Sequence, residues 1–276
     1  MQGILVRRPG GYGGGLNRPG GRMSGLAAAA LVLGVFVAIT LVVELVVRVA
    51  HVPPYEFPPP SAVLADMVRE PGLFLSNALV TITEAALGLL LAAVVALAFA
   101  AAALHSRLLD RLLTPLVVAT QTVLVIALAP LLMIWFGYGA MPRVIICALI
   151  AFFPMAVTSL QGLRATDPQL LLLLRSVGAG GWTVFWRVRM PGAAPYLAAG
   201  LRTGATLSLV GAVVAEWAGG DPKGLGYLVI TDIARLATVQ AFAAVAVITV
   251  LGLAAFGAVV LLERRLCWWN RPKGHA

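Results

Sequence analysis

The chain has 276 residues, of which 61% are hydrophobic and 11% charged, and its mean hydropathy is +0.96. Soluble domains carry about a quarter charged residues, so this balance excludes a soluble globular protein and indicates an integral membrane protein. The net charge of +9 in a membrane chain reflects orientation in the lipid bilayer and does not indicate a nucleic-acid partner. The length allows one membrane domain and no separate soluble domain.

The amino-terminal segment, residues 1–23, is rich in Gly and Arg and lacks the apolar core of a signal peptide. We expect it to be a disordered, basic cytoplasmic tail. Residues 24–263 form the predicted transmembrane domain, and residues 264–276 a short cytoplasmic tail.

Six apolar runs follow the tail, each long enough to cross about 30 Å of hydrocarbon at about 1.5 Å per residue. Backbone polar groups in lipid must bond within the segment, so the runs predict six transmembrane helices and an all-α membrane protein. The runs are Ser24–Val47, Leu73–Leu104, Leu112–Gly137, Val144–Leu163, Tyr196–Ala218 and Leu236–Leu262.

The basic residues predict the orientation of these helices. An even number of spans places both termini on one side, and most of the 20 Lys and Arg residues fall on that side. The positive-inside rule therefore predicts that the N- and C-termini and the connection 164–195 are cytoplasmic. The basic residues of the opposite side are Arg48, Arg69, Arg143, Lys223 and Arg235.

The cytoplasmic connection 164–195 has the signals of two short helices. Asp167-Pro168 predicts a helix start, because Asp accepts hydrogen bonds from free amides and Pro fits the first helical position. Gly178 stands where a left-handed residue ends a helix. The stretch "GGWTVFWRV" then opens a second helix, which Pro191 and Pro195 are expected to stop before the chain re-enters the membrane.

Trp182, Phe185 and Trp186 lie beside Arg187 on that second helix. Aromatic residues with arginines are typical of protein interfaces. They are equally typical of an amphipathic helix on lipid headgroups. The residues alone leave both interpretations open.

The connection resembles the cytoplasmic EAA loop of ABC importer permeases. The family pattern has an E-A-A triplet, three residues, a glycine, and an I-x-L-P ending. Gly178 matches the glycine, and Val188, Met190 and Pro191 match the ending. The triplet differs, because leucines stand at 172–174.

Three further segments resemble permeases of the sulfonate, taurine and nitrate type. They are "PPPSAVLA" at 58–65, "ALAPLLMIWFGYG" at 127–139 and "GAVVAEWAGGDPKGLGYLV" at 211–229. The resemblance implies the type I ABC importer architecture and a multi-pass protein of the prokaryotic inner (plasma) membrane. It implies transport of sulfonates, nitrate-like ions, aromatic acids or vitamin precursors.

The same resemblance implies the partners: two cytosolic ABC ATPase subunits, an extracytoplasmic solute-binding protein and a second permease copy. The loop after the fifth span, "GGDPKGLGYLVITDIAR", is then expected to dock the binding protein. The connection 164–195 becomes the element that couples to the ATPase. Its candidate ATPase-coupling residues are Arg175, Gly178, Ala179, Trp182, Phe185, Trp186, Arg187 and Pro191.

No ATP site is expected in this chain. A P-loop needs a Gly-Lys pair, and both lysines of the chain follow a proline. ATP and Mg are therefore expected on the partner ATPase. The three histidines have no partners at metal-ligand spacing, and no catalytic motif is present, so the chain is predicted to be a transport subunit and not an enzyme.

Polar residues and prolines within the spans are candidates for the translocation pathway. Pro130 and Pro154 are expected to interrupt and bend their helices, for the pathway or for packing. Glu216 is either a pathway residue or a helix-end carboxylate that reaches the interface or pairs with Arg235. The role of Glu84 stays open. The candidates are Gln121, Thr122, Pro130, Pro154 and Glu216.

Two other classes of function, alternatives to the ATP-driven importer, require features of their own. An ion-coupled secondary transporter predicts paired charges near mid-membrane and an internal repeat, and neither is clear in the sequence. A membrane-bound enzyme requires a catalytic constellation that the sequence lacks.

Overall fold

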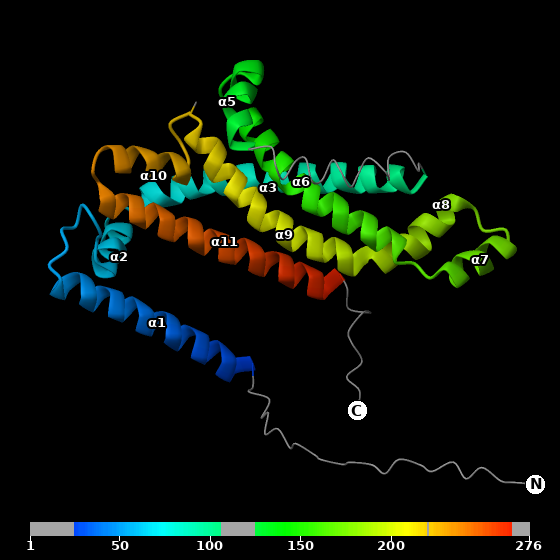
Figure 1. The fold of residues 1–276 in the computed structure, drawn as a ribbon, viewed down its shortest axis with the longest axis horizontal. Coiled ribbons are helices and arrows are strands. Elements are labelled where there is room, and N and C mark those ends of the chain that lie inside the picture. The colour runs from blue at the N-terminus through cyan, green and yellow to red at the C-terminus, as the bar shows by residue number, and fades with distance from the viewer. Residues whose placement is uncertain (1–24, 106–124, 220, 267–276) are drawn as a thin grey trace, which may run out of the picture.

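The computed structural model describes residues 25–105, 125–219 and 221–266, and every regular element in these ranges is a helix (Figure 1). The elements are α1 (Gly25–Val49), α2 (Pro60–Arg69), α3 (Pro71–His105), α5 (Val125–Phe136), α6 (Ala140–Arg164), α7 (Pro168–Ser176), α8 (Gly181–Val184), the π-helix η1 (Phe185–Arg189), α9 (Met190–Trp217), α10 (Leu225–Ala234) and α11 (Thr238–Leu266).

The prediction of an all-α membrane protein is confirmed. Among the described residues, four helical runs are long and apolar enough to cross a membrane: 71–104, 140–164, 181–217 and 238–265. Helix α1 covers the first predicted span, and the shorter α5 covers the second half of the third. Gln121 and Thr122 lie in the first half of that third span, outside the described residues.

Helices α3, α6 and α9 form the centre of the bundle, and glycines set their spacing. Small residues let membrane helices approach closely, which replaces the hydrophobic driving force that lipid removes. A Cβ on Gly211 would lie 2.8 Å from the Cα of Cys147, so α9 meets α6 backbone to backbone. Three further glycines face side chains of the partner helix, so that the four contacts run in antiparallel order along the pair: Gly211 with Cys147, Gly204 with Met155, Gly200 with Thr158, and Gly162 with Tyr196.

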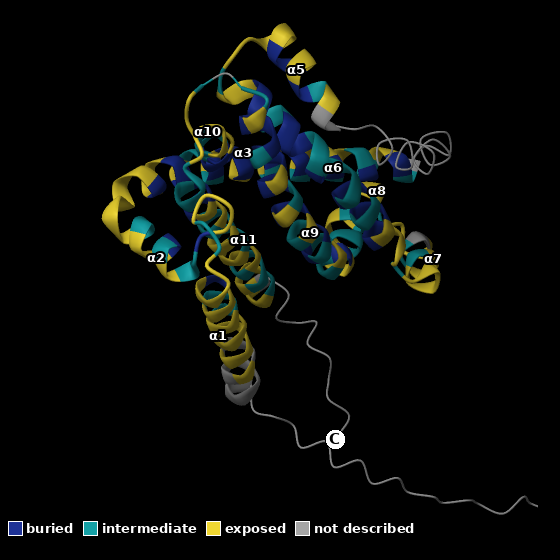
Figure 2. Cartoon of the chain, turned by 60° about the vertical axis from the view of Figure 1, so that its left-hand side comes forward, coloured by how far each residue is buried: buried dark blue, intermediate teal, exposed yellow. Residues whose placement is uncertain are grey.

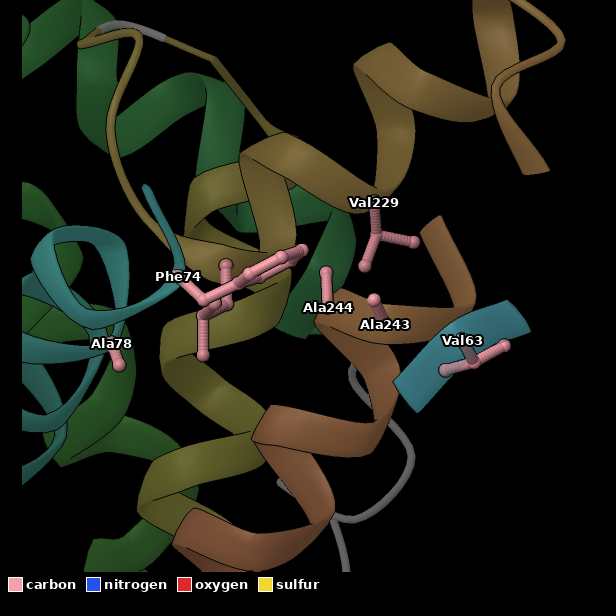
Figure 3. Packing of buried hydrophobic residues seen from close by; sticks show 7 residues of the cluster. Val63, Phe74, Ala78, Val229, Ala243 and Ala244 are labelled. Atoms are coloured by element: carbon pink, nitrogen blue, oxygen red, sulfur yellow. The ribbon is translucent and has the colours of Figure 1, made fainter. Parts of the chain in front are cut away.

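A second apolar cluster closes one end of the bundle, where α2 and α10 pack against α3 and α11. Figure 3 shows Phe74 of α3 and Val229 of α10 directed toward Ala243 and Ala244 of α11, with Val63 of α2 at the edge. We call this end the α10 end, and the opposite end, which carries α7 and α8, the α7 end (Figure 1).

Helix α1 lies along the side of the bundle and is exposed over most of its surface (Figure 2). Polar contacts join it to α2: Glu44 accepts the Ser61 amide at 2.9 Å and is bonded to Arg48 at 2.6 Å. Helix α1 begins and α11 ends toward the α7 end of the bundle (Figure 1). The cytoplasmic location of that end stays a prediction from the basic residues.

Pro130 and Pro154 lie inside α5 and α6, and both helices continue through them. The prediction that they interrupt their helices is therefore wrong. A proline removes one bond to the preceding turn, and α6 continues through this loss where it is packed between α3 and α9. The bend and the pathway role expected of these prolines stay predictions.

Candidate functional site

The first half of the connection at the α7 end folds as its sequence predicts. The Asp167 carboxylate accepts the Gln169 amide at 2.8 Å and caps α7, which begins at Pro168. Gly178 has φ +75°, and the Ala179 amide donates to the Leu174 carbonyl at 2.9 Å. This bond is the signature of a Schellman motif, so the left-handed helix end predicted at Gly178 is confirmed.

The second half differs from its prediction. The helix that opens at Gly181 does not stop at Pro191, and α8, η1 and α9 form one run to Trp217. The Met190 amide bonds to the Phe185 carbonyl, five residues back, in a π-type turn. Such a wide turn admits Pro191, because the carbonyl that its ring would meet in an α-helix is displaced. Pro195 also lies inside α9.

The aromatic residues of the segment divide between the surface and the bundle. Trp182 is 76% exposed and Trp186 48% exposed, and their rings meet edge to face at 5.7 Å. Phe185 packs inward against the apolar residues that join α3, α6 and α9. Arg187 is exposed, and Arg175 lies on α7. The inward ring fixes the segment to the bundle and leaves both tryptophans outside.

Helix α7 adds apolar residues to the same exposed surface. Leu172, Leu173 and Val177 are all well exposed. A groove of about 250 Å³ separates α7 from the end of α3 and from η1, and Ala179 lies on its wall. An exposed apolar and aromatic patch on a fixed scaffold is typical of a protein interface. We call residues 167–191 the coupling segment, after the role that the resemblance implies for them.

A buried polar cluster occupies the α10 end of the bundle. The side chain of Glu216 is 0% exposed. Its carboxylate accepts the Thr81 hydroxyl at 2.7 Å and the Gly226 amide at 2.6 Å. It neither reaches the interface nor hydrogen-bonds to Arg235 among the described residues, so that structural alternative is wrong. Glu216 caps the start of α10.

Two further side chains of α3 complete this cap. Asn77 accepts the Gly224 amide at 2.8 Å, and Thr81 accepts the Leu225 amide at 2.9 Å. Three of the four free amides that open α10 are therefore bonded to side chains of α3 and α9. Gly224 has φ +110°, and a Cβ there would collide with the Glu216 carboxylate. The "GLG" of the sequence thus lets the backbone approach a buried carboxylate.

Arg143 forms the other half of the cluster and is 1% exposed. Its guanidinium bonds to the Glu84 carboxylate at 3.1 Å. It also donates to the Asp221 carbonyl at 2.7 Å and to the Lys223 carbonyl at 3.2 Å. Glu84, whose role the sequence left open, is therefore half of a buried ion pair between α3 and α6.

The sequence reasoning missed Arg143 because it began the fourth span at Val144, whereas α6 begins at Ala140. An arginine inside the first turn of a transmembrane helix is costly unless it has partners, and that cost was the available signal. Asn77 and Thr81 were also missed, because Asn and Thr near a helix end usually only bond locally.

Comparison with known proteins identifies the chain. Residues 74–267 match the family described as the inner membrane component of binding-protein-dependent transport systems. The chain belongs to this family. The match includes the coupling segment and every member of the buried polar cluster.

Named relatives agree with this assignment. A probable ABC transporter permease of Haemophilus influenzae is 34% identical over 86% of this chain and 96% of its own length. The formylaminopyrimidine transport permease ThiX of Halalkalibacterium halodurans is 32% identical over 80% of this chain and 88% of its own. The taurine transport permease TauC of Escherichia coli is 31% identical over 58% of each chain.

The permease is thus an ABC importer subunit of the prokaryotic plasma membrane, which it crosses several times. It is a transport subunit and not an enzyme. Membership implies that it works in a complex with an ATPase and a solute-binding protein.

Proposed function

We propose that the permease imports a small organic solute by ATP-driven alternating access and that its coupling segment carries the motion of the ATPase to the membrane helices. One observation carries the proposal. The segment presents exposed Trp182 and Trp186 while Phe185 anchors it to the bundle. A rigid apolar surface of this kind fits a groove on a protein, whereas a headgroup-bound helix needs no anchor in the bundle.

The remaining partners follow from this role. ATP and Mg bind to the ATPase, because a force-transmitting segment needs no nucleotide site of its own. Two permease copies face each other, so that closure of an ATPase pair draws two coupling segments together. The α7 end and both termini are cytoplasmic, as the basic residues predict. The solute-binding protein docks at the α10 end.

The substrate class follows from the relatives. We propose a vitamin-precursor heterocycle of the formylaminopyrimidine class first, because ThiX aligns over 80% of the chain and TauC over 58%. Sulfonates and taurine come second. Glu216 is not offered as a substrate ligand, because both of its carboxylate oxygens accept hydrogen bonds from the protein.

The test uses the complete complex, purified with its ATPase and binding protein and placed in proteoliposomes. We expect uptake of labelled formylaminopyrimidine that requires ATP on the ATPase side, with taurine transported poorly. Uptake driven by a proton or sodium gradient without ATP would instead make the protein an ion-coupled secondary transporter. Equal ATP-driven uptake of taurine would overturn the substrate class alone.

A further inference from the structure

The buried ion pair at the α10 end lies directly beneath the turn that joins α9 to α10. The Arg143 guanidinium reaches two backbone carbonyls of this turn, those of Asp221 and Lys223, and also the carboxylate of Glu84. The side chains of Asp221 and Lys223 remain well exposed. The side chains of Asp221 and Lys223 therefore lie at the surface, while their backbone carbonyls are bonded to Arg143 of α6, which pairs with Glu84 of α3.

Helix α6 connects this tie to the coupling segment. It spans 25 residues, about 37 Å, with Arg143 in its first turn and Asp167 three residues beyond its end. Helix α9 runs back from η1 to Glu216, and glycine contacts hold the two helices together along their length. The α6–α9 pair therefore has the turn held by Arg143 at one end and the coupling segment at the other.

The hydrogen bonds of Arg143 hold the turn, but they do not satisfy every polar atom of the ion pair. Arg143 Nε and Glu84 Oε2 are buried and have no hydrogen-bond partner among the described residues. The nearby Glu216 carboxylate does not complete this network, because its two oxygens accept the Thr81 hydroxyl and the Gly226 amide. Each buried polar atom without a partner costs about 1–3 kcal/mol, so this network holds the turn less firmly than a fully bonded one would.

We propose that Arg143 is a positioning residue that, with Glu84, latches the 221–223 part of the turn to α6, so that a protein docking on the turn changes the tilt of the α6–α9 pair. The inference rests on the proposed function, because it places the binding-protein signal at the turn and its response at the coupling segment. Glu216, Thr81 and Asn77 act separately by capping α10.

The test compares Arg143→Gln/Glu84→Gln with the wild type. Removing both charges together leaves neither partner of the Arg143–Glu84 pair as an unpaired buried charge, so the double variant is expected to fold. In the purified permease, we expect hydrogen exchange of the turn to rise at least roughly ten-fold, while α10 exchanges as in the wild type, because its cap is intact. Ser208→Ala is the matched control, since Ser208 is buried on α9 and its hydroxyl donates to the Ala85 carbonyl of α3, away from the turn.

The functional readout is the ATPase activity of the complete complex with and without binding protein. We expect the double variant to keep basal ATPase and to lose most of its stimulation by binding protein, while Arg143→Lys is intermediate. A merely structural role would lower basal and stimulated rates together. Unchanged exchange in the turn overturns the latch, and full stimulation despite raised exchange overturns its role in coupling.

These outcomes are separable from failure of the proposed function. Exchange of the turn is measured on the permease alone and does not depend on any ATPase. If the wild-type complex shows no ATP-driven uptake but the double variant still frees the turn, the latch stands and the transport mechanism falls.

Discussion

Gly178 turns the chain between α7 and α8 with φ +75°, and a Cβ there would meet no other atom within 4 Å. The demand for glycine is therefore purely conformational. A residue with a Cβ loses about 1 kcal/mol in this region, which reduces the population of the turn roughly five-fold.

We expect Gly178→Asp to lower ATPase association by about that factor, or more if the added charge lies in the contact. Gly180→Asp is the matched control, since Gly180 has φ −66° and equal open space. The measurement is ATPase recovered per permease in a pull-down. Equal losses in both variants would mean that the charge, and not the left-handed turn, is responsible.

We expect substitutions of Glu216 to lower the stability of the fold, and to affect transport only as a consequence. Replacing it by Ala orphans the Gly226 amide at a cost of about 1–3 kcal/mol, whereas the Thr81 hydroxyl keeps the Asn77 carbonyl as an acceptor at 3.1 Å. Thermal unfolding in detergent should show a clear drop for Glu216→Ala and a smaller one for Glu216→Gln. A Glu216→Ala protein that unfolds like the wild type but transports nothing would make the carboxylate a pathway group.

Among the helices, the α6–α9 contact is sensitive to added volume. We expect Gly211→Ala to lower the free energy of unfolding by about 1–3 kcal/mol, because the new methyl meets the α6 backbone. Gly257→Ala on α11 meets nothing within 4 Å and should be neutral or slightly stabilising. If chemical unfolding finds the two variants equal, glycine spacing does not set the distance between α6 and α9.

The exposed face of the coupling segment should matter for assembly and not for folding. Trp182→Ala is expected to reduce ATPase recovery while leaving the unfolding temperature unchanged, because Trp182 is 76% exposed. Trp135→Ala on α5 is the comparison, since Trp135 is 70% exposed and lies away from the segment. Retention of full ATPase recovery in Trp182→Ala would assign this tryptophan to the headgroup region.

Local signals made the first half of the coupling segment predictable. The Asp167 cap, the Pro168 start and the Gly178 turn each depend on neighbours within a few residues. The continuation through Pro191 was not predictable, because the π-turn that admits the proline forms within a helix packed on α6. Tertiary packing here overrides a strong local breaker.

The contacts of the buried cluster could not be predicted from local signals. Its partners are far apart in the chain, with Glu84 pairing with Arg143 and Thr81 with Glu216. Sequence pattern marks each as an expensive group inside a span, but only the packing of α3 against α6 and α9 shows which groups meet. Glu216 was therefore named as a candidate while its true partners were not.

At the scale of the whole molecule, the α6–α9 pair joins two ends with different chemistry. The α7 end carries an exposed apolar surface, and the α10 end a buried charge cluster beneath an exposed turn. This division suits a subunit that receives force from one partner and a signal from another. It predicts that damage at either end changes coupling without destroying the bundle.

The most direct test of this account is purification of the tagged permease from its own host in mild detergent, with mass spectrometry of the co-purifying proteins. We expect an ABC ATPase with the wild type and a several-fold loss of it with Gly178→Asp, at equal permease recovery and equal unfolding temperature. An ATPase retained fully by Gly178→Asp, or absent from a folded wild-type preparation, would contradict the role of the coupling segment.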